Sequence, residues 1–257
     1  MRENKLKQLW KQGETVVNAW VTIPSSWSAE VMAHAGFDSL TIDMQHGLAD
    51  YQTALSMLQA ISTTDAVPLA RVTWNDPGII MRLLDAGVYG IICPMINTRA
   101  EAEAFVGACR YPPAGYRSYG PIRALTYGGE DYGLHANENI LTLAMIETAR
   151  ALQNLDDILS TPGLDGLYVG PADLSMGMGL ADLANFQNPE LLRLLDTILD
   201  AAARHGVMPG VHANTPQNAI MLSERGFRFV TLYSDTILLR TAARAAVTQT
   251  RAGRISL

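Results

Sequence analysis

Short apolar segments alternate with longer helix-like segments along almost the whole chain. Eight of the apolar segments are typical of strands: residues 16–23, 39–44, 67–72, 90–95, 142–147, 166–171, 208–213 and 229–234. Most are near-continuous apolar runs, as expected for strands that are buried on both faces of a parallel sheet. Eight strand–helix units, with no break in composition across residues 1–257, predict one α/β domain, a single (β/α)8 TIM-type barrel.

A doubly wound open sheet is the alternative fold for such an alternation. That fold usually has fewer strands and begins with a glycine-rich turn that binds phosphates. The turn after the first strand here, PSSWSAE at residues 24–30, has neither a G-x-G-x-x-G pattern nor a Walker lysine. The barrel is therefore the favoured prediction.

The composition limits the functional class. The chain has 257 residues, a net charge of −6 and no dense patch of Lys and Arg, which argues against a nucleic-acid-binding surface. No apolar run approaches the roughly 20 residues that span a bilayer, and residues 1–14 lack the apolar core of a signal peptide. Two cysteines make no disulfide framework. We therefore expect a cytoplasmic protein with neither membrane nor nucleic-acid partners.

Two carboxylates follow neighbouring predicted strands. Glu147 comes at the end of TLAMIE and Asp173 shortly after GLYVGP. Because active sites of such barrels lie at the C-terminal ends of the strands, the two side chains could converge on one divalent cation. Oxygen ligands favour Mg²⁺ or Mn²⁺, and Co²⁺ or Zn²⁺ could substitute. The alternative is that each carboxylate only caps the helix that follows it.

Other strand ends supply a cation and a titratable base. Arg71 ends the third predicted strand, where it either anchors an anion or closes a structural salt bridge. His46 lies three residues after Asp43. It is either a packed or solvated ring, or a base that the nearby acid orients.

The lysines exclude one kind of carbonyl chemistry. All three of them, Lys5, Lys7 and Lys11, lie in the polar N-terminal segment. No predicted strand carries a lysine that could form a Schiff base with a carbonyl substrate. Carbon–carbon chemistry in this barrel would therefore need a metal as its electron sink.

One stretch interrupts the alternation. Residues 111–141 form a long connection rich in Gly, Pro and Tyr. Long connections inside compact domains are usually functional lids or oligomer contacts. A tolerated surface insertion is the alternative.

These residues, in this order, resemble the 4-hydroxy-2-oxoheptanedioate aldolase family of class II, metal-dependent pyruvate aldolases. The family belongs to the citrate lyase-like, phosphoenolpyruvate–pyruvate barrel superfamily. The resemblance covers residues from about 15 to 245, and its most specific motifs are RYPPAGYRS and VGPADLS. It implies an extra N-terminal helix within residues 1–14 and a role in aromatic-compound catabolism. It also implies a homo-oligomer, a hexamer built as a trimer of dimers, whose subunits exchange C-terminal helices within residues 235–257.

The resemblance implies a role for several site residues. Glu147 and Asp173 would be the metal ligands. The backbone N–H groups of Ala172 and Asp173, just after Gly170, would hold the substrate carboxylate. Arg71 would face the keto oxygen and stabilise the enolate as charge builds there.

The remaining implied roles concern proton transfer. His46 would be the base, and Asp85 in LLDAG would raise its basicity, more easily across a subunit contact than within one barrel. The substrates would be a 2-oxo acid, pyruvate or a relative such as hydroxypyruvate, and an aldehyde. The enzyme would cleave or form 4-hydroxy-2-oxo acids through a metal-stabilised enolate.

The chain departs from the family pattern at the predicted pocket. Met145 stands where the family has a substrate-contacting glutamine, and Gln45 stands where it usually has glutamate. His212 occupies a position where we expect an apolar residue near the aldehyde. It either binds a polar acceptor or has a structural role.

Two alternatives to an aldolase stay open. One is a related carbon–carbon lyase for malyl- or citryl-type substrates, and a thioester substrate would want a basic patch for its coenzyme phosphates. The other is a non-catalytic metabolite-binding barrel, which would leave the complete metal, arginine and histidine set unexplained.

Overall fold

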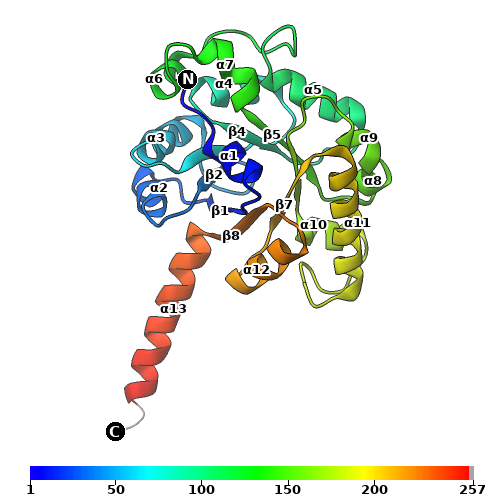
Figure 1. Cartoon of the computed structure of the whole chain (residues 1–257). Coiled ribbons are helices and arrows are strands. Elements are labelled where there is room, and N and C mark those ends of the chain that lie inside the picture. Colours follow the sequence, from blue (N-terminus) through cyan, green and yellow to red (C-terminus); the bar gives the residue numbers. More distant parts are fainter. Residues whose placement is uncertain (255–257) are drawn as a thin grey trace.

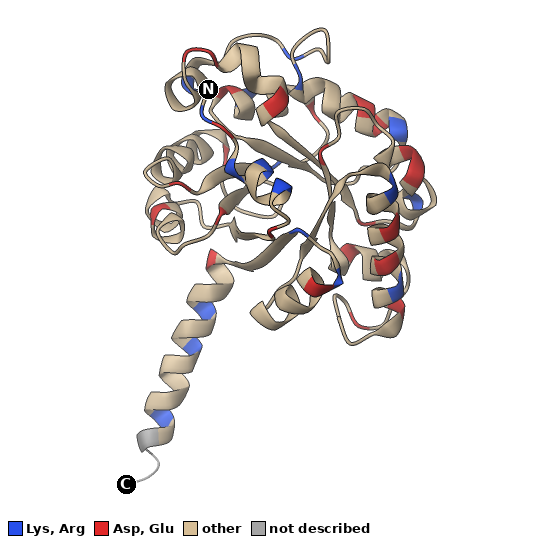
Figure 2. Cartoon of the chain, viewed as in Figure 1, with Lys and Arg blue, Asp and Glu red and all other residues tan. Residues whose placement is uncertain are grey.

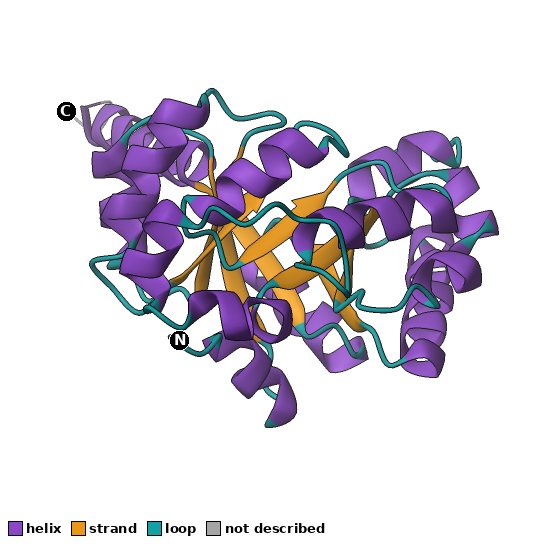
Figure 3. Cartoon of the chain, turned by 90° about the horizontal axis from the view of Figure 1, so that it is seen from above, coloured by secondary structure: helices purple, strands orange, loops and turns teal. Residues whose placement is uncertain are grey.

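The computed structural model describes residues 1–254 and contains the predicted barrel. Each strand pairs in parallel with the next, and β8 pairs with β1 to close the sheet (Figures 1 and 3). The strands are β1 (Val16–Val21), β2 (Ser39–Asp43), β3 (Val67–Arg71), β4 (Gly90–Cys93), β5 (Leu141–Ile146), β6 (Gly166–Val169), β7 (Met208–His212) and β8 (Phe229–Ser234). All eight predicted strands are confirmed.

Thirteen helices are described around and beyond the barrel. They are α1 (Lys5–Lys11), α2 (Ser26–Ala33), α3 (Tyr51–Ile61), α4 (Pro77–Asp85), α5 (Arg99–Cys109), α6 (Ile122–Gly128), α7 (Tyr132–Asn139), α8 (Ala149–Gln153), α9 (Leu155–Leu159), α10 (Pro171–Gly177), α11 (Pro189–His205), α12 (Pro216–Arg225) and α13 (Asp235–Arg254). Most begin at a side chain that caps their first N–H groups, as Asp76 does for α4.

The barrel interior contains a polar network among apolar side chains. Asn18 accepts hydrogen bonds from Ser39 at 2.9 Å and Thr41 at 3.0 Å, and it donates to Thr231 at 3.0 Å. The Tyr168 hydroxyl lies 2.8 Å from the same Thr231 oxygen. Because alternate residues of a strand share a face, Trp20 lies on the same side of β1 as Asn18. The network thereby supports the aromatic floor of the cavity described below.

The N-terminal end of the barrel is closed by α1. Leu6 is fully buried, and the Asn4 side chain donates to the backbone carbonyls of Tyr89 and Asn139. The predicted N-terminal helix is confirmed, with seven helical residues inside the range 1–14.

The segment 111–141 is not an irregular loop, because it contains α6 and α7. It packs at the same N-terminal end, where Gly128 and Asn139 bond to the backbone of Arg2 and Asn4. The prediction of an active-site lid is therefore wrong: α5 delivers the chain to this end and β5 starts from it. An oligomer contact stays a prediction.

The C-terminal helix α13 projects from the body of the protein (Figure 1). Asp235 fixes its start, since its carboxylate accepts bonds from the Thr22 and Ile23 backbone and from the Ser28 hydroxyl. Every residue from 239 to 252 is exposed. The predicted helix is thus present over 235–254, and residues 255–257 lie outside the described part. No helix among the described residues is both long and apolar enough to cross a membrane.

Candidate active site

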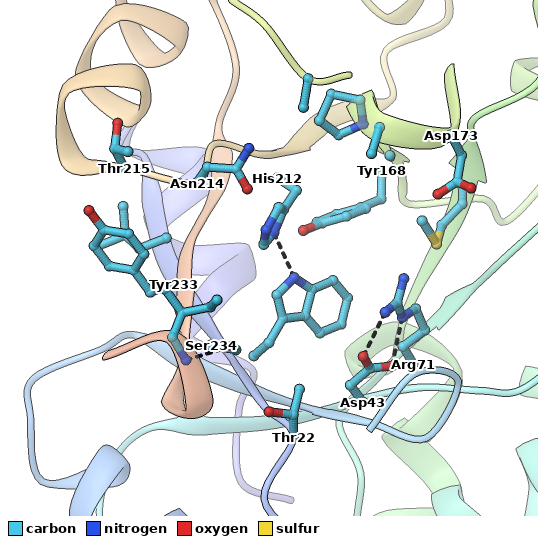
Figure 4. A pocket seen from close by; sticks show the side chains of 18 residues that line it. Thr22, Asp43, Arg71, Tyr168, Asp173, His212, Asn214, Thr215, Tyr233 and Ser234 are labelled. Carbon is cyan, nitrogen blue, oxygen red and sulfur yellow. Dashed lines mark hydrogen bonds and ion pairs between the residues drawn. The ribbon is translucent and has the colours of Figure 1, made fainter. Parts of the chain in front are cut away.

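A cavity of about 470 Å³ lies at the C-terminal ends of the strands (Figure 4). Strand ends, the start of α10 and the first turn of α13 form its walls. Seven of the predicted site residues line it: Asp43, Arg71, Met145, Gly170, Ala172, Asp173 and His212. The position is the one that barrel enzymes use for catalysis.

Arg71 and Asp43 form a buried ion pair on one side of this cavity. They end β3 and β2 and are opposite each other in the strand register. The Nε of Arg71 donates to Oδ1 of Asp43 at 2.8 Å, and Nη2 donates to Oδ2 at 2.6 Å. A guanidinium has five N–H donors, so Arg71 keeps donors beyond this salt bridge. The two predicted roles of Arg71, salt bridge and anion anchor, are therefore compatible.

Glu147 follows β5 and is only 3% exposed. Its Oε1 accepts the backbone N–H of Met95 at 2.8 Å. Burial raises the pKa of Glu147, and the nearby charge of Asp173 raises it further. A Cβ on Gly170 would lie 2.7 Å from Oε2. Glycine at position 170 therefore leaves the room that the Glu147 carboxylate occupies.

Asp173 lies in the first turn of α10 and is exposed to the cavity. Within residues 1–254 it has no hydrogen-bond or ion-pair partner. No side chain caps α10, and over the same range the N–H groups of Ala172 and Asp173 have no protein acceptor. This end of the barrel therefore presents an unmatched carboxylate beside free backbone donors.

The pair of Glu147 and Asp173 fits a divalent cation. The charge of Asp173 raises the cost of ionising Glu147, and a cation between the two carboxylates would remove that cost. Mg²⁺ and Mn²⁺ are commonly held by one or two carboxylates and complete their shells with water and substrate oxygens. In the described part of the chain no cluster of three or more His, Cys, Asp or Glu could hold a metal. An open site with two protein ligands fits this arrangement better than a closed structural zinc site.

Aromatic and imidazole rings form the floor of the cavity. Trp20 donates its indole N–H to Nδ1 of His212 at 2.7 Å, and its ring packs edge-on against Tyr168. The Arg71 guanidinium lies over the Trp20 ring, with Cζ 4.4 Å from the ring centroid. Burial, followed by the Arg71 charge, lowers the pKa of His212 to about 4. His212 is therefore a neutral imidazole at physiological pH.

His46 and Asp85 lie outside the cavity lining. His46 is exposed on the loop after β2, and its backbone N–H donates to Oδ1 of Asp43 at 3.3 Å. Asp43 thus bonds to the loop backbone and to Arg71, with no bond to the imidazole among the described contacts. A side chain at Gly47 would collide with the Asp43 backbone, so the loop turns on a glycine.

Asp85 lies low in its own barrel, as expected. It ends α4, and its carboxylate accepts Nη2 of the fully buried Arg117 at 2.7 Å. The two potential proton-transfer residues are therefore not brought together within one chain.

Several lining residues were missed from the sequence, chiefly Trp20, Tyr168 and Asn214. A polar or amphipathic side chain inside an apolar strand was the available signal for the first two. Asn214 offered none, since its cavity position depends on a left-handed backbone (φ 66°) after β7.

Comparisons with known proteins identify the family of this chain. A family model described as HpcH/HpaI aldolase/citrate lyase matches residues 17–242. The hydroxypyruvate/pyruvate aldolase of Rhizorhabdus wittichii is 39% identical over 97% of this chain and 99% of its own length. The 4-hydroxy-2-oxo-heptane-1,7-dioate aldolase of Escherichia coli is 40% identical over 95% of this chain and 93% of its own length.

A solved structure gives the same relationship. An HpcH/HpaI aldolase/citrate lyase family protein from Burkholderia cenocepacia superposes with a TM-score of 0.89 at 33% identity, over 96% of this chain and 99% of the other. The family match spans most of the barrel, and the similar proteins named above are aldolases, which are carbon–carbon lyases. The chain belongs to the HpcH/HpaI aldolase/citrate lyase family.

Proposed function

We propose that this protein is a divalent-metal-dependent aldolase that forms and cleaves 4-hydroxy-2-oxo acids, with pyruvate or hydroxypyruvate as the donor. One observation carries the proposal. Two carboxylates that have no ion-pair partner among residues 1–254, Glu147 and Asp173, share one end of the barrel with Arg71, a guanidinium that keeps spare donors. The names of the similar proteins from R. wittichii and E. coli support the same substrate classes.

The inventory of lysines supports a metal rather than an imine. Lys5, Lys7 and Lys11 all belong to α1, which packs on the N-terminal end of the barrel. The cavity is at the opposite end, so a Schiff-base mechanism has no nucleophile there. Divalent-metal dependence is general in the family. Glu147 and Asp173 would hold Mg²⁺ or Mn²⁺, which would supply Lewis acidity to the substrate carbonyl.

The protein groups around the cavity have separate tasks in this proposal. The N–H groups of Ala172 and Asp173 bind the donor carboxylate, as helix N-termini bind anions. The spare N–H groups of Arg71 stabilise the negative charge that develops on the keto oxygen when a methyl proton leaves. His46 accepts that proton. The methyl carbon then bonds to the aldehyde carbon, and the aldehyde oxygen takes up a proton to become the 4-hydroxyl group.

We also propose that the working form is a homo-oligomer in which α13 packs on a neighbouring subunit. The projecting part of α13 exposes Leu239 and Val247 and carries only basic charges, at Arg240, Arg244 and Arg251 (Figure 2). Exposed apolar residues on a projecting helix are typical of a protein–protein contact. Light scattering should give a mass several times that of the 27.9 kDa chain, and removal of residues 239–257 should lower it.

Release of pyruvate from a 4-hydroxy-2-oxo acid tests the enzyme activity directly. The rate is measured for protein as purified, after EDTA, and after addition of Mg²⁺ or Mn²⁺. We expect activity that EDTA removes and metal restores. Activity that EDTA leaves intact would contradict metal dependence, and no cleavage with any metal would contradict an aldolase.

A further inference from the structure

The half of the cavity that faces away from the carboxylates is polar but uncharged. Its hydrogen-bonding side chains are Thr22, His212, Asn214, Thr215, Tyr233 and Ser234 (Figure 4). Among the lining residues of the described chain, Arg71 is the one cation, and Asp43 already matches its charge. A buried carboxylate needs a paired cation to offset its desolvation. This half of the cavity therefore suits neutral polar groups better than a second carboxylate.

His212 is the central donor of this half, and its tautomer is determined by Trp20. The indole of Trp20 is a donor only, so the Nδ1 atom 2.7 Å from it must accept. A neutral imidazole with an accepting Nδ1 carries its proton on Nε2. Since burial keeps the ring neutral, with a pKa of about 4, His212 offers one N–H donor on the side of the ring that faces Asn214.

Asn214 completes this arrangement. Its left-handed backbone (φ 66°), which asparagine tolerates better than most residues, places its amide beside the His212 ring (Figure 4). The amide has both donor and acceptor atoms. Together the two side chains form a rigid donor–acceptor pair that matches a hydroxyl group, which also donates and accepts.

We infer that His212, positioned by Trp20 and flanked by Asn214, selects the aldehyde substrate, and that this substrate is a neutral hydroxyaldehyde rather than a carboxylated or unsubstituted one. The inference rests on the proposed aldolase function and adds the acceptor class to it. A site that hydrogen-bonds a substrate hydroxyl rejects the analogue without it, because the buried donor is then left unpaired. A carboxylated aldehyde would meet no free cation here.

The test uses two acceptors that differ by one hydroxyl, glycolaldehyde and acetaldehyde, each with pyruvate. The acceptor ratio is kcat/KM for glycolaldehyde divided by kcat/KM for acetaldehyde. Comparing each variant's ratio with the wild-type ratio cancels the intrinsic reactivity of the aldehydes. We expect His212→Leu to lower the wild-type ratio by about tenfold or more, and His212→Gln, which keeps an N–H donor, to restore part of it. Succinic semialdehyde, a carboxylated acceptor, should react less efficiently than glycolaldehyde in the wild type.

Trp20 is a positioning residue in this account, so it needs a separate readout. Trp20→Phe keeps a ring under Arg71 but removes the indole N–H. We expect the ¹⁵N shifts of the His212 imidazole to report loss of the single Nε2–H tautomer, with a fall in the acceptor ratio. Trp10→Phe is the matched control, because it removes an indole bond to the Arg228 carbonyl (2.9 Å) at the other end of the barrel. It should leave both readouts unchanged.

The outcomes separate this inference from the function on which it rests. An unchanged acceptor ratio in His212→Leu, or a wild-type preference for succinic semialdehyde, overturns the inference while pyruvate methyl-proton exchange still proceeds. Absence of that exchange in the wild-type protein with metal overturns the aldolase proposal itself.

Discussion

The two ends of the barrel differ in whether their carboxylates have partners within the chain. At the N-terminal end, Asp165 accepts bonds from Arg110 at 2.6 Å, from Lys7 at 2.8 Å and from the Thr142 N–H at 3.0 Å. At the C-terminal end, Glu147 has one backbone donor, and Asp173 has no partner among residues 1–254. Both ends hold carboxylates next to a parallel sheet. Only Glu147 and Asp173, at the C-terminal end, remain available to bind a ligand.

The difference indicates which charges stabilise the fold and which serve chemistry. A buried charge that lacks its partner costs several kcal/mol, so a fold keeps such charges only where something else binds them. Asp165 has its partners within the chain, and its removal should affect stability. The buried Glu147 and the exposed Asp173 have no such partners among residues 1–254, and their removal should affect metal binding and turnover.

The largest effect is expected for Asp173→Ala. It removes one of two protein ligands, so metal-dependent cleavage of a 4-hydroxy-2-oxo acid should be abolished. Because Asp173 is exposed and unpaired, thermal stability without metal should stay within about 0.5 kcal/mol of wild type. Calorimetric metal titration and turnover measure the loss of function, and thermal unfolding without metal measures the stability. Near-normal activity would remove Asp173 from the ligand set.

Loss of the proposed base comes next. His46→Ala should slow exchange of the pyruvate methyl protons with solvent deuterium by about 10²-fold or more, since general-base catalysis contributes on that scale. Metal affinity should not change, because His46 is not one of the two proposed metal ligands. Unchanged exchange would mean that another group takes the proton.

Arg71 has both a structural role, in its salt bridge with Asp43, and a proposed catalytic role. Its replacement should lower the rate by about 10²-fold or more through lost stabilisation of the keto oxygen. Arg71→Ala alone also leaves Asp43 buried and unpaired, so the double variant Asp43→Asn/Arg71→Ala serves as the stability control. Rate and metal affinity are measured together. A parallel loss of both would make Arg71 structural.

The smallest effect on activity is expected at the N-terminal end. Asp165→Ala should lower the free energy of unfolding by about 3 kcal/mol, because Arg110 is left buried without its partner. Turnover at a temperature where the variant stays folded should match wild type. A large loss of kcat with little loss of stability would show that the two ends do not divide their tasks in this way.

Much of the fold could be predicted from the sequence because strands buried on both faces are apolar along their whole length. Arg71 and Glu147 were recognisable for a similar reason: a charged residue that ends such a run must lie at a strand end. The helices within 111–141 were not recognisable, because this segment is rich in Gly and Pro, and its helices depend on contacts with α4 and with residues 2–7.

The cavity floor depended on closure of the sheet. Trp20 and His212 are distant in sequence, and their bond forms because β7, β8 and β1 are neighbours in the closed barrel. His46 and Asp85 are not brought together among the described residues, and the expectation that they meet across a subunit contact stays a prediction. Neither relation can be read from local residue patterns.

Exchange of the pyruvate methyl protons in D₂O, followed by proton NMR, tests the central claim most directly because it needs no aldehyde. The wild-type protein is measured as purified, after EDTA, and after Mg²⁺ or Mn²⁺ is restored. We predict exchange that disappears with EDTA and returns with metal, and no metal-dependent exchange in Asp173→Ala. Exchange that persists in EDTA, or that Asp173→Ala retains in full, would contradict this prediction.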